Sequence, residues 1–415
     1  MLPGLWPEKN AGVKCRMDGQ YSFPADLCLK CSICNTVCPV YAVNPNYPGP
    51  KFIGPELARL GELQQGGCSG ADYCTGCRQC ELACPNGVPI THLVHQVKEE
   101  GKKVKTVPFR DRILGHNQLV SGLASLVPNF TNTVLGSKFV RLLMENFLGI
   151  KNRPFPRYHK AFSYKPPYIA AGSLKVAYFT GCYSRFNEPN ISQSVVKILE
   201  KCGVQVVVPP QKCCGVPMFF NGLLAEGKKN AEDNLAVLGD LVDRGYQIVA
   251  SCPSCTLSLK HEYGLLVQHP QAAKVAAQVY DISEFLIDYQ LLSDQVFLPI
   301  NKRYFYHQPC HTKVQGMGSP ALDLLKLIPA LAMVSREQKC CGQAGTYGFK
   351  KEKYETSAAI AQKLFLDIAE SSVDGVVTEC GMCRLQLSGG TGKIVLHPLE
   401  LLAISMSAIN QTFKE

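Results

Sequence analysis

The sequence predicts a protein of mixed class, in which a mostly helical N-terminal domain is followed by two duplicated α/β domains. Three observations support this prediction. One pattern of four cysteines occurs twice near the N-terminus, and a different set of five cysteines recurs in the rest of the chain. Apolar, strand-like runs alternate with helical stretches around each copy of the second set, which is typical of α/β domains with a parallel sheet.

The two N-terminal runs have the form C-x2-C-x2-C-x3-C-P, the pattern of bacterial ferredoxins. Three thiolates at this spacing can turn inward around one iron–sulfur cube, whereas the fourth binds the neighbouring cube. Paired cysteines are also typical of structural zinc sites, but a doubled run of four that ends in proline is more specific. We therefore predict two cubane 4Fe–4S clusters, one held by Cys28, Cys31, Cys34 and Cys84 and the other by Cys74, Cys77, Cys80 and Cys38.

The segment between these runs indicates a helical domain. It is longer than a compact small ferredoxin allows, and it contains GPELARLGEL at 54–63, whose apolar spacing predicts a helix. We expect a helical ferredoxin domain with two clusters to span residues 1–105.

The five-cysteine set occurs twice and indicates an internal duplication. Apolar runs such as KVAYFTGC and RYFYHQPC end at cysteines, and stretches such as NISQSVVKILEKCG predict helices between them. Because sites in parallel sheets collect at the carboxyl ends of strands, each set is expected at one edge of one sheet. The copies are Cys182, Cys213, Cys214, Cys252 and Cys255, and, 127 or 128 residues further on, Cys310, Cys340, Cys341, Cys380 and Cys383.

Each copy contains two adjacent cysteines inside the pentapeptide QKCCG. Successive side chains of an extended strand point to opposite faces, so we expect the following glycine to permit a turn that aims both sulfurs the same way. Five thiols are one too many for an ordinary cubane. One sulfur is therefore expected to bridge two irons or to stay free.

These motifs together resemble the heterodisulfide reductase superfamily, whose CCG units hold non-cubane 4Fe–4S clusters with five cysteines. Longer stretches are similar to the family of iron–sulfur C subunits of anaerobic glycerol-3-phosphate dehydrogenases, namely VNPNYPGPK, KCCGVP, HQPCH, CCGQAGTYGFKKEKY and HPLELLA. The resemblance implies one or two non-cubane clusters in the CCG domains at 173–295 and 296–415, with zinc or free thiols as the alternative in one of them.

The resemblance also implies a function. An FAD-dependent flavoprotein partner would oxidise glycerol 3-phosphate, and this chain would carry the electrons to the (mena)quinone pool in anaerobic respiration. No G-x-G-x-x-G fingerprint for a flavin or nicotinamide is found, so we assign no catalytic residue to this chain. The alternatives are the iron–sulfur subunit of a glycolate oxidase and a disulfide reductase acting at a CCG cluster.

Composition bears on location and partners. The 415 residues include 21 cysteines, which in a reducing cytoplasm favours metal ligands over disulfides. We find no signal peptide and no uncharged apolar run of about 18 residues. The net charge of +10 suits an acidic partner or an anionic membrane, but clusters with a charge of about −2 each offset part of it. With the resemblance, we expect a peripheral protein on the cytoplasmic face of the inner membrane and no nucleic-acid partner.

Residues 106–172 are expected to be amphipathic helices followed by a Pro-rich linker. The helices contact either a membrane surface or the other domains. We expect His311 to orient a loop and Lys350 and Lys351 to be solvated surface. The basic residues on or near the polar side of the helices are Arg110, Arg112, Lys138 and Arg141. Three cysteines outside the motifs are expected to be inert and buried, namely Cys15, Cys68 and Cys202.

Overall fold

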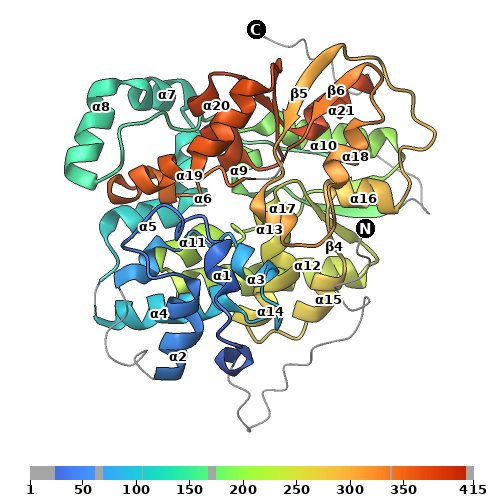
Figure 1. Cartoon of the computed structure of the whole chain (residues 1–415). Coiled ribbons are helices and arrows are strands. Elements are labelled where there is room, and N and C mark those ends of the chain that lie inside the picture. The colour runs from blue at the N-terminus through green and yellow to red at the C-terminus, as the bar shows by residue number, and fades with distance from the viewer. Residues whose placement is uncertain (1–23, 61–68, 105, 167–173, 337–338, 408–415) are drawn as a thin grey trace.

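The computed structural model describes residues 24–60, 69–104, 106–166, 174–336 and 339–407. It confirms the predicted class, because an N-terminal group of helices is followed by two α/β halves, each with a four-stranded parallel sheet. In Figure 1 the N-terminal helices lie at the lower left, and the second α/β half extends across the upper part of the molecule, from α19 and α20 left of centre to β5 and β6 at the right. Cys15 and Cys68 are outside the described residues.

Short helices joined by turns form the N-terminal domain. The longest of them, α4, packs against η2 and buries Leu93, Val94 and Val97 in the core of the domain. The helix expected at 54–63 is present in η2 and α2, as far as the described residues extend. The elements are η1 (Pro24–Leu27), α1 (Ile33–Thr36), η2 (Phe52–Glu56), α2 (Leu57–Leu60), η4 (Ser69–Tyr73), α3 (Gln79–Leu82) and α4 (Ile90–Val104).

The helices expected between 106 and 150 are also present. Helix α5 packs against α11 and helix α6 against α9, whereas α7 and α8 lie at the left edge of the molecule in Figure 1. Residues 152–166 contain no helix or strand, but Tyr158 and Phe162 are buried, so this stretch packs against the rest of the chain. The helices are α5 (Phe109–Gly115), α6 (Asn117–Ala124), α7 (Pro128–Gly136), α8 (Lys138–Leu143) and η5 (Met144–Leu148).

The first α/β half has the strand order β2–β1–β3–β4, all parallel. Its strands are β1 (Lys175–Phe179), β2 (Gln205–Val207), β3 (Gln247–Ala250) and β4 (Val279–Asp281). Its helices are α9 (Gly181–Phe186), α10 (Pro189–Lys201), α11 (Val216–Asn221), α12 (Leu224–Asp243), α13 (Pro253–Leu257), η6 (Ser258–Glu262), α14 (Tyr263–Leu266), α15 (Ala272–Ala277) and α16 (Ile282–Asp288).

The second half repeats this topology as β6–β5–β7–β8. Its strands are β5 (Lys302–Tyr306), β6 (Leu331–Val334), β7 (Gly375–Val377) and β8 (Ile394–Leu396). Its helices are α17 (Cys310–Lys313), α18 (Pro320–Leu325), η7 (Tyr347–Phe349), α19 (Lys351–Glu370), α20 (Gly381–Thr391) and α21 (Pro398–Ser405). The identical order supports the predicted duplication.

The two halves share one hydrophobic core. Helix α10 packs against α21, and α16 packs against α18. In the duplication, α10 of the first half corresponds to α18 of the second, and α16 corresponds to α21. The two contacts are therefore the same contact made twice, once in each direction between the halves. Phe285 from the first half and Leu399 from the second are buried in this core. The halves therefore form a single packed body.

A histidine also connects the halves, at the turn after β8. His397 begins α21, and its Nδ1 accepts a hydrogen bond from the backbone N–H of Leu399 at 3.2 Å. Its Nε2 donates to the carbonyl of Ser251 in the first half at 3.2 Å. Asp281 begins α16 in the equivalent way, accepting from the backbone N–H of Ser283 at 2.9 Å.

Candidate iron–sulfur sites

Four groups of cysteines stand out in the structure, and none of the described cysteines forms a disulfide. We name them by the predicted ligands. The first ferredoxin set is Cys28, Cys31, Cys34 and Cys84, and the second ferredoxin set is Cys38, Cys74, Cys77 and Cys80. The first CCG set is Cys182, Cys213, Cys214, Cys252 and Cys255, and the second CCG set is Cys310, Cys340, Cys341, Cys380 and Cys383.

The loops that carry the ferredoxin cysteines have an unusual backbone. Lys30 and Ser32 have φ angles of 60° and 66°, and the equivalent Gly76 and Arg78 have 67° and 58°. These left-handed residues lie on both sides of Cys31 in the first run and of Cys77 in the second, and they curl the chain around a point. A left-handed conformation costs free energy in residues other than glycine, so it is uncommon in them. The backbone N–H of Lys30 donates to the sulfur of Cys28 at 3.4 Å. The conformation thus exposes backbone donors to sulfur.

The structure brings together the members of each ferredoxin set across the two runs. All four cysteines of the first set line one small cavity. Burial raises the pKa of Cys34, and the three other thiols of its set raise it further. Burial likewise raises the pKa of Cys38 to about 12, with added contributions from Cys77 and Cys74 in the other run. Packed thiols whose ionised forms repel one another are suited to a cationic partner.

Tyr47 adds a wall to the second ferredoxin set. It is 2% exposed. Burial raises the pKa of its hydroxyl, and the negative charges of the four thiolates of that set raise it further. Tyr47 belongs to the stretch NPNYPGP at 44–50. In the same stretch, Asn44 donates from Nδ2 to the hydroxyl of Thr356 on α19 at 3.0 Å. The stretch therefore screens this set from water and fixes it against the second α/β half.

The first CCG set gathers at the carboxyl edge of the first sheet, as predicted. Cys182 follows β1, the Cys213–Cys214 pair follows β2, and Cys252 follows β3. The sulfurs of Cys182 and Cys213 are 4.0 Å apart. Hydrogen bonds from the thiols of Cys213 and Cys255 lower the pKa of Cys214 to about 6. Both sulfurs of the adjacent pair therefore face the same set.

Glycine makes this turn possible in both halves. Gly215 and Gly342 have φ angles of 89° and 76°, which favour glycine. A Cβ at Gly342 would lie 2.1 Å from the carbonyl oxygen of Ser357, and a Cβ at Gly215 would lie 2.6 Å from the ring of Phe219. The glycine of each CCG triplet is thus favoured by both its backbone conformation and its close packing.

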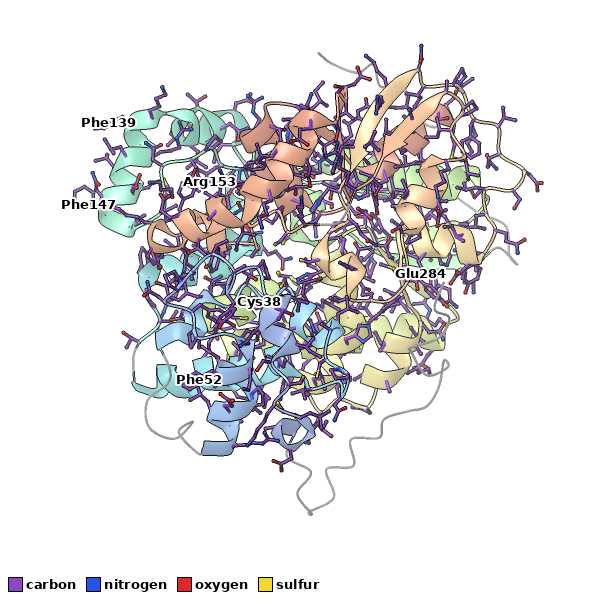
Figure 2. All side chains as sticks on the ribbon, viewed as in Figure 1. Cys38, Phe52, Phe139, Phe147, Arg153 and Glu284 are labelled. Carbon is purple, nitrogen blue, oxygen red and sulfur yellow. The ribbon has the colours of Figure 1, made fainter. Side chains whose placement is uncertain are left out.

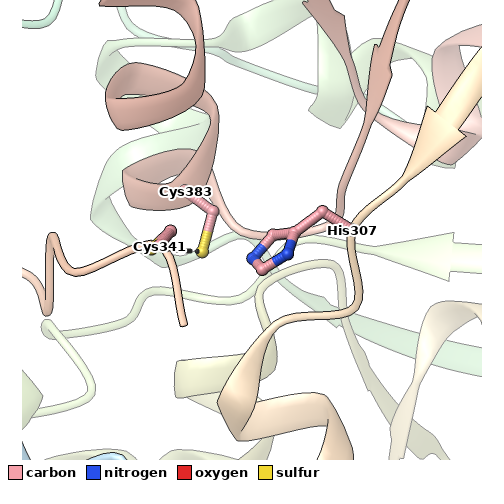
Figure 3. A group of neighbouring side chains, drawn as sticks. All are labelled: His307, Cys341 and Cys383. Carbon is pink, nitrogen blue, oxygen red and sulfur yellow. Dashed lines mark hydrogen bonds between the residues drawn. The ribbon is translucent and has the colours of Figure 1, made fainter. Parts of the chain in front are cut away.

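The second CCG set occupies the equivalent edge of the second sheet and includes a histidine that the sequence analysis did not select. The sulfurs of Cys341 and Cys383 are 3.1 Å apart, and His307 offers a ring nitrogen within 4.8 Å of both (Figure 3). His307 is 1% exposed, and it faces the sulfur of Cys341, whose pKa is lowered first by hydrogen bonds from Cys340 and Cys383 and further by His307. The equivalent position in the first half is Phe179, so the two sites differ.

His311 orients a loop, as expected. Its Nδ1 is 2.8 Å from the hydroxyl of Ser254 in the first half, and its Nε2 is 3.1 Å from the carbonyl of Gly76 in the N-terminal domain. Since a carbonyl only accepts, Nε2 is the donor and Nδ1 accepts from Ser254. One side chain therefore holds three parts of the chain together.

The four sets lie next to one another in a definite order. The two ferredoxin sets share the short helices α1 and α3, which contact each other. Cys77 of the second ferredoxin set and all five cysteines of the second CCG set line a cavity of about 90 Å³. Cys380 of the second CCG set also lines a cavity of about 230 Å³ with four cysteines of the first CCG set. The second CCG set therefore lies between the second ferredoxin set and the first CCG set.

Helix α6 is attached to the first CCG set by two residues that the sequence analysis did not single out. Asn117 donates from Nδ2 to the sulfur of Cys182 at 3.2 Å. Gln118 donates from Nε2 to the carbonyl of Gln211 at 3.0 Å and accepts from the backbone N–H of Cys213. The helical segment thus carries part of the environment of this set.

The basic residues of the helical segment divide into two groups. Arg110 pairs with Glu352 at 2.8 Å, and Asp111 pairs with Lys350 at 2.9 Å. Lys350 is 8% exposed, so the expectation that it is solvated surface was wrong. Its charge is compensated by the partly buried carboxylate of Asp111. By contrast, Arg112 and Lys138 are exposed.

The outer surface of the same segment is apolar. Exposed side chains lie on successive helices, with exposures of 69% for Phe139 and 82% for Phe147. Both point away from the molecule in Figure 2. We call this surface the apolar arm; its members are Leu119, Leu123, Leu126, Val127, Phe130, Phe139, Leu142, Leu143 and Phe147. Within the described parts of the chain, no helix has the length and apolar character needed to cross a membrane.

The donors present fit iron–sulfur clusters. Thiols converge at four places, and sulfurs accept hydrogen bonds from Lys30, Asn117 and the backbone N–H of Gly342, which lies 3.3 Å from Cys340. Such contacts are typical of cluster ligands. Of the cysteines outside the sets, Cys202 is partly buried against the shared core, where a thiol acts as a small apolar side chain.

Comparisons with known proteins agree with this geometry. A 4Fe–4S dicluster domain matches residues 24–88, and a cysteine-rich domain matches twice, at residues 176–260 and 304–388. The C subunit of the anaerobic glycerol-3-phosphate dehydrogenase of Escherichia coli is 34% identical over 92% of this chain and 98% of its own length. The B subunit of the fumarate reductase (CoM/CoB) of Methanothermobacter marburgensis is 28% identical over 92% of this chain and 72% of its own. A "Probable glycolate oxidase iron-sulfur subunit" of Bacillus subtilis is 24% identical over 90% and 92%.

The dicluster domain implies two cubane clusters, and the cysteine-rich domains indicate further iron–sulfur sites. Fold and sites together define the class: an iron–sulfur electron-transfer subunit with one dicluster domain and two cysteine-rich domains. Within that class, the chain belongs to the family that includes the C subunit of the anaerobic glycerol-3-phosphate dehydrogenase of Escherichia coli. Similarity to one subunit of a multi-subunit dehydrogenase implies protein partners.

Proposed function

We propose that the chain passes electrons from a flavoprotein that oxidises glycerol 3-phosphate to a membrane quinone. The observation that carries the proposal is the order of the four cysteine sets, which leads from the N-terminal domain to a large cavity beside the apolar arm. The 34% identity to a glycerol-3-phosphate dehydrogenase subunit over nearly the whole chain supports this substrate. The flavoprotein would bind beside the first ferredoxin set, where Cys31 is exposed.

In this proposal each ferredoxin set holds one cubane cluster and each CCG set holds a non-cubane cluster, with zinc as the alternative in one CCG set. When bound, such clusters supply one-electron carriers whose potentials depend on hydrogen bonds to sulfur and on exposure. The protein orients the thiols through the left-handed residues of the ferredoxin loops and through Gly215 and Gly342. Asn117 would set the environment of Cys182 by donating to its sulfur.

The apolar arm would place the chain on the cytoplasmic face of the inner membrane. An apolar surface on helices that are too short to span a bilayer suits attachment within the interface. Arg112 and Lys138 are exposed nearby and would add attraction to anionic lipid of about 1 kcal/mol each. Arg110 would not take part, because Glu352 already binds its guanidinium.

A reconstituted complex tests the proposed function. The chain is co-purified with a candidate flavoprotein and placed in quinone-containing vesicles. Glycerol 3-phosphate should reduce the quinone, and glycolate should not. Reduction by glycolate alone would instead assign the chain to a glycolate oxidase. If the isolated chain with an artificial electron donor turned over a disulfide substrate, the disulfide reductase alternative would hold.

A further inference from the structure

The cavity of about 230 Å³ lies between the two CCG sets. A cavity of roughly 10–15 Å³ is enough to hold one water molecule, so this cavity is much larger than a hydration site. Its volume is also more than twice that of the cavity of about 90 Å³ at the second CCG set, which is lined by six thiols, the five of that set and Cys77. If one cluster occupies each cavity, the larger of the two keeps the greater remaining space, which we assign to a second group.

One wall of the cavity is formed by the helical segment and the stretch after it, and it is largely apolar. Leu114 of α5, Val120 of α6 and Leu135 of α7 line it, together with Ile150 and Phe155 from the stretch that follows. Ligand sites for small organic molecules are typically apolar with a few fixed polar groups. This wall therefore suits a flat, hydrophobic ring rather than a charged metabolite.

Tyr158 supplies a fixed polar group on this wall. Its backbone N–H donates to Oδ1 of Asn132 at 2.8 Å, and its carbonyl accepts from Nδ2 of the same residue at 2.8 Å. Its hydroxyl, which is protonated at neutral pH as in any tyrosine, can donate to a ligand oxygen. The oxygen of that hydroxyl can accept a hydrogen bond from Ser121, which lies beside it, and its own proton then points to the ligand. Oγ of Ser121 also lies 3.3 Å from Oδ1 of Asn117, the residue that contacts the sulfur of Cys182.

The helices that form this wall also form the apolar arm. In α6, Val120 lines the cavity while Leu119 and Leu123 are exposed on the outside. In α7, Leu135 lines the cavity while Phe130 is exposed. An apolar ligand dissolved in a bilayer would thus meet the outer face of the same helices that wall the cavity.

We propose that this cavity binds the ring of the quinone acceptor, with Tyr158 donating a hydrogen bond to a carbonyl oxygen and Val120 and Leu135 packing against the ring. The assignment rests on the proposed function. Reduction of the quinone to the quinol requires two electrons, which oxidation of glycerol 3-phosphate on the partner supplies. It also requires two protons, one for each carbonyl oxygen, which come from water.

The test fills the cavity without altering a cysteine. Val120→Trp is made in the complete complex, and Leu366→Trp, at an exposed position on α19, is the matched control. Binding is measured by quenching of the fluorescence of heptyl-hydroxyquinoline N-oxide, a quinone analogue. Dye-linked oxidation of glycerol 3-phosphate and iron content are measured in parallel. Val120→Trp should weaken analogue binding at least tenfold and reduce quinone turnover similarly, with iron content and dye-linked oxidation retained. Leu366→Trp should leave every measurement unchanged.

A gentler pair of variants protects against loss of folding. If Val120→Trp lowers iron content, Val120→Phe takes its place with the same expected pattern, and Tyr158→Phe should raise the quinone KM more than it lowers kcat. Unchanged analogue affinity in an iron-replete Val120 variant would overturn the assignment. Failure of the proposed function looks different, because the wild-type complex would then not reduce quinone with glycerol 3-phosphate at all.

Discussion

Individual residues explain how the described cysteines gather into sets. Left-handed residues such as Lys30 and Ser32 curl one ferredoxin loop, and Gly215 and Gly342 turn the adjacent cysteines toward one point. The left-handed conformations of Lys30 and Ser32 cost free energy in the metal-free chain, because neither residue is a glycine. The cost is understandable if bound metal offsets it, because ligand binding to the folded state adds to stability.

Cys38 is the residue that tests the predicted exchange of ligands between the two runs. Cys38→Ser should remove the cluster assigned to the second ferredoxin set and spare the first, because its thiol lies with Cys74 and Cys77. EPR spectra of the reduced protein check this, with Cys202→Ser as the control that keeps both signals. Loss of only the cluster of the first ferredoxin set would reverse the pairing.

Gly342 provides a test of the CCG turn. Gly342→Ala places a Cβ 2.1 Å from a backbone oxygen, whereas Gly392→Ala, at a φ of 67°, meets nothing within 4 Å. Both substitutions carry the left-handed cost of about 1–2 kcal/mol. Gly342→Ala should lower the free energy of unfolding further and should also reduce iron content. Equal midpoints of chemical denaturation for the two variants would show that the close packing at Gly342 is not required.

His397 gives the stability a predictable pH dependence. Burial lowers its pKa to about 3, below the ordinary value of about 6.5. The unfolded chain therefore binds this proton more readily, and His397 causes the free energy of unfolding to fall as the pH drops from about 6.5 toward about 3. His397→Asn should retain a cap, lose the contact with Ser251 at a cost of about 1 kcal/mol, and flatten this dependence. Melting temperatures at neutral and mildly acidic pH measure it; an unchanged slope would contradict the assignment.

At the scale of elements, the sequence predicted the strands and the ferredoxin runs well because both depend on local patterns. Apolar runs that stop at a cysteine became β1, β3, β5 and β7, and their carboxyl ends carry the sites. What it missed depends on contacts between distant residues. Asn117 resembles the polar face of any amphipathic helix, yet its partner Cys182 is 65 residues away. Lys350 resembles a surface charge, yet Asp111, its partner, is 239 residues away. His307 has no motif of its own in the duplicated half.

The apolar arm yields a prediction about whole helices. Phe139→Ser combined with Phe147→Ser should release the complex from anionic vesicles. Each phenyl ring that moves from water into the bilayer contributes about 1.5–3 kcal/mol to binding. The control pair is Val296→Ser with Leu366→Ser, which removes exposed apolar side chains elsewhere. Vesicle flotation gives the bound fraction. Equal flotation of both pairs would mean that the arm contacts a protein or another part of the complex instead.

At the scale of the whole molecule, the duplication places two sites on one packed body and the N-terminal domain against one of them. His311 connects all three parts through Ser254 and Gly76. The order of the sets could not be read from the sequence, in which the first CCG set precedes the second. Docking of the N-terminal domain against the second half reverses that order in space. The second CCG set consequently becomes the connection between the ferredoxin domain and the acceptor cavity.

The most direct test of this account is to break that connection at Cys341 and follow electrons on both sides of it. In a complex with Cys341→Ser, glycerol 3-phosphate should still reduce the two cubane clusters, as seen by EPR. Reduction of a menaquinone analogue should stop, because the set between the second ferredoxin set and the cavity has lost a ligand. Quinone reduction at the normal rate, with the cluster of the second CCG set absent, would contradict the account and leave that half with a structural role.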